Sequence, residues 1–541
     1  GSATEACGFE GGTERWTDPE QASFVLFGTP DSPFAVEIDG LRESRSVTAT
    51  RAQTRLPSRA GERATLPLAL FDRTEPRFRC AIDLPVPNGR VELSTAPEAQ
   101  TAITAGNVAR GPGLELLLSV DGELWGATVL PEEASCRLAV VRLRDAEEDR
   151  SNPVDFNRWC RVYPGSLTIR PYRDNTRLMV TSLCAQAGGA AGSRIKVAQI
   201  DADGVDIRTI NLEVPLDRVS LPIIADAMGT DEPDIFFLVQ VAEATESAPV
   251  RLVRYSPRRQ ESISIDLGNY EALTLFGDPV PAPMVIDGPR GDAILVAGHP
   301  GPAAIYDGTQ TVELMATGER NFRAPVVIEL PNALLLQELR NQRVVSTRIL
   351  TDQRRTTWRV VDTVMEPLPS FVVPDDGVRL SVGVNPDGLP VVAYSHNGAV
   401  WGWLVSDDLN VDRIDTLSTT AGSQPVLHVN LDGELGTELV TFARDSNIVR
   451  ATTQTGQALV GWPVNLTGDS GVRHVLLTDL GRSTDVPTRS LRAAEVVALT
   501  YRHLEVITLG AGSYDQSRWS WPAADGASAG RWSSPSDPYR R

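Results

Sequence analysis

One loop of the chain carries oxygen-bearing side chains at the spacing that a divalent cation requires. Asn430, Asp432, Glu434 and Glu438 occupy loop positions 1, 3, 5 and 9, and the apolar run 439–442 follows at once. Side chains at alternate positions of a tight turn can converge on one point, and carboxylate and amide oxygens suit calcium. The four residues therefore predict a calcium site. The alternative is a turn in which Asn430 and Asp432 accept backbone N–H bonds.

A serine-protease reading of the chain has little support. Gly468-Asp-Ser-Gly471 matches the nucleophile sequence of such enzymes, but the chemistry also needs a histidine base and its carboxylate. None of the histidines has the sequence context of that base; they are His299, His396, His428, His474 and His503. The tetrapeptide is typical of a polar turn, and no catalytic residue is predicted.

Trp401 and Trp403 form a second candidate for binding. Alternate positions of a strand face one side, so both indoles could form an exposed platform for a sugar or peptide. The interpretation we favour is that both pack against a neighbouring sheet.

The chain repeats one pattern, in which an acidic residue is followed by an apolar run. The clear copies begin at Glu115, Asp234, Asp292, Glu438 and Glu495, and the weaker copies at Arg177, Asn332 and Leu389. Polar turns such as Asn397-Gly398 lead into further strands. Units of about 40–60 residues with several short strands are typical of propeller blades. The sequence therefore predicts an all-β propeller with eight blades, seven being the alternative.

The ends of the chain follow this pattern poorly. Residues 1–100 predict an irregular β-rich segment that completes a blade or forms a small added layer. Residues 101–522 carry the propeller. Residues 523–541 contain Gly, Ser, Pro and Arg with little apolar content and predict a C-terminal tail.

Composition limits the partners of the protein. The formal charge of the 541-residue chain is −19, and Lys196 is its single lysine among 51 basic residues. An acidic chain without a basic stripe is unsuited to nucleic acid. No apolar run approaches the roughly 18 residues of a transmembrane segment.

The cysteines bear on location. They are Cys7, Cys80, Cys136, Cys160 and Cys184, and no CxxC pair is present, which disfavours zinc. Two disulfides with one cysteine left over fit an exported protein, whereas five buried thiols fit a cytosolic one. Cys7 lies close enough to the start to serve as a lipid anchor, although a disulfide partner is its favoured role.

These residues resemble bacterial FG-GAP or VCBS-type propeller repeats, whose loops run Asp-x-Asp-x-Asp-Gly-x-x-Asp before an apolar strand. Asn430, Asp432, Glu434 and Glu438 occupy the four ligand positions of that loop. In the loop that ends at Asp234, position 1 is Asp226, but positions 3 and 5 are Met228 and Thr230. In the loop that ends at Glu115, position 1 is Asn107, but positions 3 and 5 are Ala109 and Gly111. Gly461-Trp-Pro-Val464 resembles the Gly-Trp-Pro that leads between such repeats.

The resemblance implies an exported bacterial protein located in the periplasm, on the outer surface or outside the cell. Blade loops supply a variable rim on a rigid ring, which suits partner binding. We therefore expect a non-catalytic scaffold that binds a protein or glycan. The alternative is a hydrolase that acts on glycan or peptide with paired acids at the central mouth.

Overall fold

The fold is all-β and was described from a computed structural model of the chain. The structure describes the strands between residues 33 and 533. It also describes most of the turns within residues 192–240, 250–267, 283–297, 304–314, 322–367 and 446–472. No α-helix occurs in these described parts, and they contain no helix long and apolar enough to cross a membrane.

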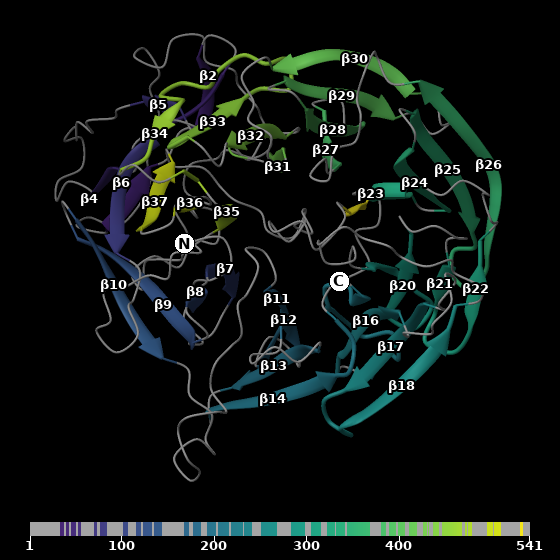
Figure 1. Ribbon diagram of the computed structural model, residues 1–541. Helices are drawn as coiled ribbons and strands as arrows, with labels where there is room; N and C mark the ends of the chain where they lie inside the picture. Colours follow the sequence, from purple (N-terminus) through teal and green to yellow (C-terminus); the bar gives the residue numbers. More distant parts are fainter. Residues whose placement is uncertain are drawn as a thin grey trace.

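Seven four-stranded sheets and one five-stranded sheet are arranged around a common axis (Figure 1). We call each of these sheets a blade. The strands of the first four blades are β7 (Thr101–Gly106), β8 (Glu115–Val120), β9 (Glu123–Glu132), β10 (Ser135–Arg142); β11 (Thr168–Tyr172), β12 (Arg177–Ala185), β13 (Ser193–Asp201), β14 (Gly204–Leu212); β15 (Ile223–Ala225), β16 (Asp234–Gln240), β17 (Val250–Ser256), β18 (Glu261–Asp266); β19 (Met284–Asp287), β20 (Asp292–Val296), β21 (Ala304–Tyr306), β22 (Thr311–Glu313).

The remaining blades continue around the ring in chain order. Their strands are β23 (Phe322–Leu330), β24 (Ala333–Arg340), β25 (Arg343–Thr351), β26 (Trp358–Pro367); β27 (Ser381–Val384), β28 (Pro390–His396), β29 (Ala399–Val405), β30 (Val411–Ser418); β31 (Leu427–Val429), β32 (Glu438–Phe442), β33 (Ile448–Thr452), β34 (Val464–Asn465); β35 (His474–Thr478), β36 (Glu495–Leu499), β37 (His503–Leu509). Within each blade, consecutive strands pair antiparallel.

The repeat predicted from the sequence marks the second strand of each blade. Six of its starting residues are the first residues of these strands: Glu115, Arg177, Asp234, Asp292, Glu438 and Glu495. The other two, Asn332 and Leu389, directly precede β24 and β28. The prediction that these runs are equivalent strands of a propeller is therefore confirmed.

The ring closes through a strand from the N-terminal part of the chain. Strand β6 (Pro76–Asp83) pairs antiparallel with β37, with Cys80 opposite Val506, and so supplies the fourth strand of the last blade. Strand β6 also contacts β10, and β35 contacts β7. The first and last blades are thereby joined both at the axis and at the outer wall.

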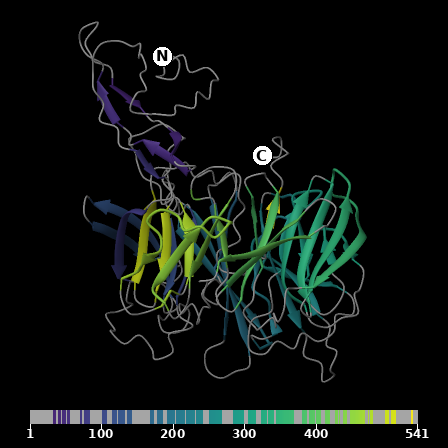
Figure 2. The same ribbon diagram turned by 90° about the horizontal axis from the view of Figure 1, so that it is seen from above.

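Five further N-terminal strands form two small sheets that project from one face of the ring near its edge (Figure 2). One sheet pairs β1 (Pro33–Val36) with β4 (Ala52–Arg55). The other joins β2 (Asp39–Arg42), β3 (Arg45–Ala49) and β5 (Leu70–Asp72).

The tail predicted for residues 523–541 contains a strand. Residues Arg531–Ser533 form β38, which pairs parallel with β23 and becomes the fifth strand of that blade. The tail prediction is wrong for these three residues. The reason is that their pairing partner lies about 200 residues earlier in the chain, so local composition carries no signal for it.

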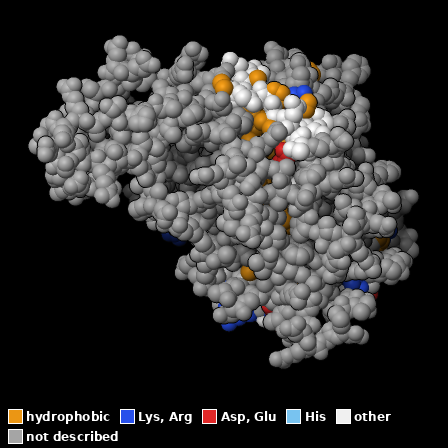
Figure 3. Space-filling view, turned by 90° about the vertical axis from the view of Figure 1, so that its left-hand side faces the viewer, with side chains coloured by type: hydrophobic (Ala, Val, Ile, Leu, Met, Phe, Trp, Pro, Cys, Tyr) orange, Lys and Arg blue, Asp and Glu red, His pale blue; other side chains and the backbone are white. Residues whose placement is uncertain are grey.

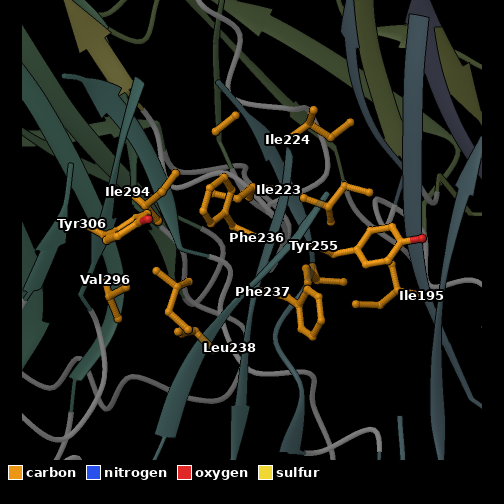
Figure 4. Close-up of a cluster of buried hydrophobic side chains, with 14 of the residues drawn as sticks. Ile195, Ile223, Ile224, Phe236, Phe237, Leu238, Tyr255, Ile294, Val296 and Tyr306 are labelled. Carbon is orange, nitrogen blue, oxygen red and sulfur yellow. The ribbon is translucent and has the colours of Figure 1, made fainter. Parts of the chain in front are cut away.

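Packing between neighbouring blades forms the core. On β16, Phe236 lies against Tyr306 and Ile294, whereas Phe237 lies on the side of Ile195 (Figure 4). The rings of Phe236 and Tyr306 have centroids 6.2 Å apart. Because successive strand residues point to opposite faces and both faces are covered by blades, β16 is apolar at consecutive positions. Similar clusters join the following blades.

Candidate functional site

The predicted calcium loop is described only in part. Asn430, Asp432 and Glu434 lie outside the described residues. Glu438 is the first residue of β32 and is paired with Val429, and its Oε2 accepts a hydrogen bond from Leu431 N at 2.7 Å. This bond holds the position-9 carboxylate against the start of the loop. The hard oxygen ligands of the set fit calcium, and Glu438 is placed where it could contribute to such a site.

The related loop that ends at Asp234 holds an arginine. Arg254 Nε lies 2.8 Å from Asp234 Oδ2, and Arg254 Nη1 lies 3.2 Å from Met228 Sδ, at loop position 3. The guanidinium therefore contacts two of the four positions that would bind a cation in a complete loop. At position 1, Asp226 Oδ1 accepts Thr230 N at 3.0 Å, which is the local turn bond of an aspartate.

Burial makes the Asp234–Arg254 pair sensitive to change. The two side chains are 9% and 11% exposed. Burial raises the pKa of the Asp234 carboxyl above its ordinary value, and the positive charge of Arg254 opposes that rise. A buried carboxylate needs a counter-charge, and here the protein supplies it from β17.

Asp292 joins three consecutive blades. Its Oδ2 accepts Asp226 N at 2.6 Å, and its backbone N donates to Asp226 O at 3.0 Å. The same carboxylate oxygen forms an ion pair with Arg170 Nη1, and that nitrogen also donates to Ile224 O at 3.2 Å. Arg170 belongs to β11, Ile224 to β15 and Asp292 to β20. The carboxylate that begins β20 thus fastens its blade to the two that precede it.

Two other glutamates make the same kind of contact between blades. Glu329 Oε1 of β23 accepts Asp287 N, at the end of β19, at 3.0 Å. Glu505 of β37 accepts the N–H of Thr467, which follows β34. Both glutamates are almost fully buried. Buried carboxylates that accept backbone N–H groups satisfy donors at blade ends, so these acids have a structural role.

Gly308 permits the close approach of two blades at Ala227. Gly308 has φ of 90°, and a Cβ there would lie 2.0 Å from Ala227 O of the preceding blade. Tyr306 Oη donates to Gly308 O at 2.9 Å. Any side chain at Gly308 would push these blades apart.

Two of the five histidines lie buried on inner strands. His428 belongs to β31 and His474 to β35, and neither Nε2 has a hydrogen-bond partner among the described residues. His428 Nδ1 lies 3.2 Å from Thr437 Oγ1. A Cβ on Gly383 of β27 would lie 2.2 Å from the same His428 Nδ1. Burial lowers the pKa of His428 to about 3 and of His474 to about 4. His428 packs against the neighbouring blade at Gly383, and both histidines are too deeply buried to act as solvent-accessible bases.

The two tryptophans proposed as a binding platform are packing residues as well. Trp403 is 4% exposed and packs against the β23–β26 blade, where its Nε1 donates to Gln337 Oε1 at 2.9 Å. Trp401 is partly buried against the same cluster. The preferred interpretation, packing against a neighbouring sheet, is confirmed. Residues 468–470 of the Gly-Asp-Ser-Gly sequence lie outside the described residues.

The chain's own C-terminal part lies at the axis of the ring. The order of strands in the five-stranded blade is β26, β25, β24, β23, β38, so β38 lies on the inner edge. It also contacts β19 and β27, the inner strands of the two neighbouring blades. Figure 1 shows this short yellow strand inside the ring beside β23.

The described surface residues form no clear candidate for a binding patch. On the face seen in Figure 3, described side chains are of mixed type and gather no broad charged patch. The exposed large apolar side chains among described residues are Ile263, Val361, Met365 and Leu389. Single apolar side chains of this kind are normal on a protein surface.

Sequence reasoning missed the arginines that complete the site. Arg254 lies on β17, the strand that pairs with β16, whereas Arg170 lies two blades before Asp292. The usable signal was the loss of inner ligands at Met228 and Thr230, which leaves a carboxylate in need of another cation. In a chain whose basic residues are nearly all arginine, an arginine was the natural substitute.

Comparison with known proteins names no family for this chain. No family model matches the chain, and no curated protein matches it. Among solved structures, the Dos1 propeller is 11% identical with a TM-score of 0.43, and the match covers 82% of this chain and 96% of that one. A protein from Lactobacillus plantarum is 9% identical with a TM-score of 0.34, over 69% and 96% of the two chains. A functionally unknown protein from Desulfotomaculum acetoxidans is 11% identical with a TM-score of 0.34, over 69% and 97%.

The sheets and their ring arrangement define the class of protein: the chain is an all-β propeller. The likeness to FG-GAP and VCBS repeats stays a prediction.

Proposed function

We propose that the protein is a non-catalytic propeller scaffold that binds a protein or glycan partner. The observation that carries the proposal is the position of β38. A propeller enzyme of the expected type would bind substrate at the central mouth, but here β38 lies on the channel side of β23, in contact with β19 and β27. A chain segment at the inner edge of one blade takes up part of the space at the axis, which favours the rim loops as the surface for partners.

The described acids support the same proposal. Asp234 is paired with Arg254, Asp292 with Arg170, and Glu329 accepts a backbone N–H. A paired-carboxylate hydrolase needs two acids that face one substrate across several ångströms. Arg254 belongs to the same blade as Asp234, whereas Arg170 and the backbone donor of Asp287 belong to other blades than the carboxylates they contact.

The experiment compares binding with turnover on the full-length chain. The protein is applied to glycan and peptide arrays and is separately incubated with chromogenic glycosides and fluorogenic peptides. We expect saturable binding to one class of array member and no turnover above buffer. Turnover that scales with protein concentration and survives further purification would contradict the proposal and favour the hydrolase.

Calcium and export complete the proposal. The Asn430–Glu438 loop would hold one calcium ion, supported by the spacing of its oxygens and by the position of Glu438 against Leu431. Export to the periplasm, the outer surface or the medium is supported by five cysteines without a zinc pattern and by the likeness to exported bacterial repeats. A lipid anchor at or before Cys7 would be one route of attachment.

A further inference from the structure

The channel-side edge of β23 is paired with a strand that contributes only three residues. Val327 pairs with Arg531, Ile328 with Trp532, and Glu329 with Ser533. This is the one parallel pairing among the described strands of the ring, and among those strands only this blade has a fifth member. The segment is therefore an addition to a complete four-stranded blade.

Strand β38 is surrounded by the inner strands of three neighbouring blades. Val327, Ile328 and Glu329 are fully or almost fully buried. The adjacent strands β19 and β27 also contact β38, so it lies in a slot between three inner strands. The hydrogen bond from Asp287 N to Glu329 Oε1 fixes one wall of the slot to its floor. A slot that is held by the blades themselves persists when β38 leaves.

The pairing of β38 with β23 is of a kind that another peptide could make in place of β38. An extended segment that adds to a sheet edge is bound mainly through its backbone groups, so a different peptide can make the same ladder. The blade strands beneath it pair over longer stretches, as β24 does with β25 from Ala333 to Arg340. A three-residue strand should therefore leave the sheet well before the blade unfolds.

We propose that the channel-side edge of β23 is a docking site for an extended peptide strand, and that Arg531–Ser533 is its built-in occupant. The ligand is a partner peptide that adds as a parallel strand and displaces β38. This rests on the scaffold function proposed above and names the class of its partner. Because the occupant is part of the same chain, it competes at a high effective concentration. The wild-type protein therefore keeps the site closed to weak ligands.

The test uses full-length protein and a fluorescein-labelled peptide with the sequence of residues 526–537. Trp532→Pro in the protein removes a backbone donor from the centre of β38 and should release it. We expect this variant to bind the peptide at least tenfold more tightly than the wild type does in fluorescence anisotropy. Ser528→Pro, outside β38, is the matched control and should behave as wild type. The peptide carrying the same Trp532→Pro change should not bind.

Equal affinity of wild type and variant, or equal binding of both peptides, would overturn the proposal. Hydrogen exchange on the wild-type chain gives a second readout if the variant proves unstable. Amides at 531–533 should exchange more slowly than in the free peptide but sooner than those of β24. Exchange as fast as the free peptide, or only together with β24, would overturn it too. Neither result bears on array binding or turnover, so the scaffold function is judged separately.

Discussion

In the loop that ends at Asp234, an arginine contacts two of the four positions at which a complete calcium loop would carry its ligands. Arg254 lies where the inner ligand and the closing carboxylate of a complete loop would meet a metal, and it contacts Met228 and Asp234 there. A guanidinium is always charged and carries five hydrogen-bond donors. It can therefore balance a buried carboxylate without a metal ion that must bind from solution and be coordinated by several ligands. The carboxylate at the start of β16 is thereby balanced although its loop carries no oxygen at position 3.

Removing Arg254 tests this role. Arg254→Met should lower the free energy of unfolding by about 3–5 kcal/mol, because it leaves the Asp234 carboxylate buried without its counter-charge. Asp234→Asn in the same chain should restore much of the loss. Denaturation in guanidinium chloride measures the four proteins of the cycle. Additive losses in the double variant would contradict the pairing.

We propose calcium for the loop that keeps its oxygens, Asn430–Glu438. Added calcium should raise the melting temperature of the wild type relative to a chelator, because a ligand that binds only the folded state stabilises it by about 2.7 kcal/mol at a hundredfold excess over Kd. Asp432→Asn with Glu434→Gln should abolish the difference, and the exposed Glu261→Gln should leave it intact. The absence of any shift in the wild type would rule out the metal.

The two buried histidines should make stability depend on pH. Burial lowers the pKa of His428 to about 3 and of His474 to about 4, whereas both have a pKa near 6.5 in the unfolded chain. Below that value the unfolded state gains protons and the folded state does not, so the free energy of unfolding falls as pH falls from about 6.5 toward about 4.

Urea denaturation at about pH 7.5 and about pH 5 measures the fall. Asp234 has a raised pKa and acts in the opposite sense, so the comparison of variants carries the test. The double variant His428→Gln, His474→Gln should lose less stability between the two pH values than the wild type. An identical loss in both proteins would show that the imidazoles do not titrate as stated.

At the scale of elements, the second strand of each blade could be predicted because it has a local signature. Glu115, Asp234, Asp292, Glu438 and Glu495 each precede an apolar run that is buried on both faces, and each begins a strand. Strand β38 has no such signature, since Arg531–Ser533 is polar around one tryptophan and acquires its structure from the edge of β23. Likewise, no local pattern could connect Arg170 with Asp292, which lie two blades apart.

The contact between β6 and β10 leads to a prediction about the cysteines. Cys80 lies on β6 and Cys136 on β10, and these strands of the last and first blades contact each other. A disulfide between them would fasten the ring where it closes. We expect peptide mapping under non-reducing conditions to find this pair, and Cys80→Ser with Cys136→Ser to lower the free energy of unfolding by about 2–4 kcal/mol.

A matched control for that pair is Cys184→Ser on β12. Its effect should be smaller and independent of reductant. Five free thiols in protein purified without reductant would contradict both the disulfide and the main support for export.

At the scale of the whole molecule, the ring depends on contacts between distant parts of the chain. Strand β6 completes the last blade, and β38 lies at the axis beside β23. Carboxylates on Asp292, Glu329 and Glu505 join neighbouring blades through backbone N–H groups. These acids thus hold neighbouring blades together, and the C-terminal strand adds to the inner edge of one blade. Eight blades stays the predicted number for the complete chain.

The electron density along the ring axis in a crystal of the full-length protein tests this account most directly. The account predicts density for Arg531–Ser533 running parallel to β23 between β19 and β27, within a ring of eight blades. An open channel lined by converging acids would contradict it and would favour an enzyme that works at the central mouth.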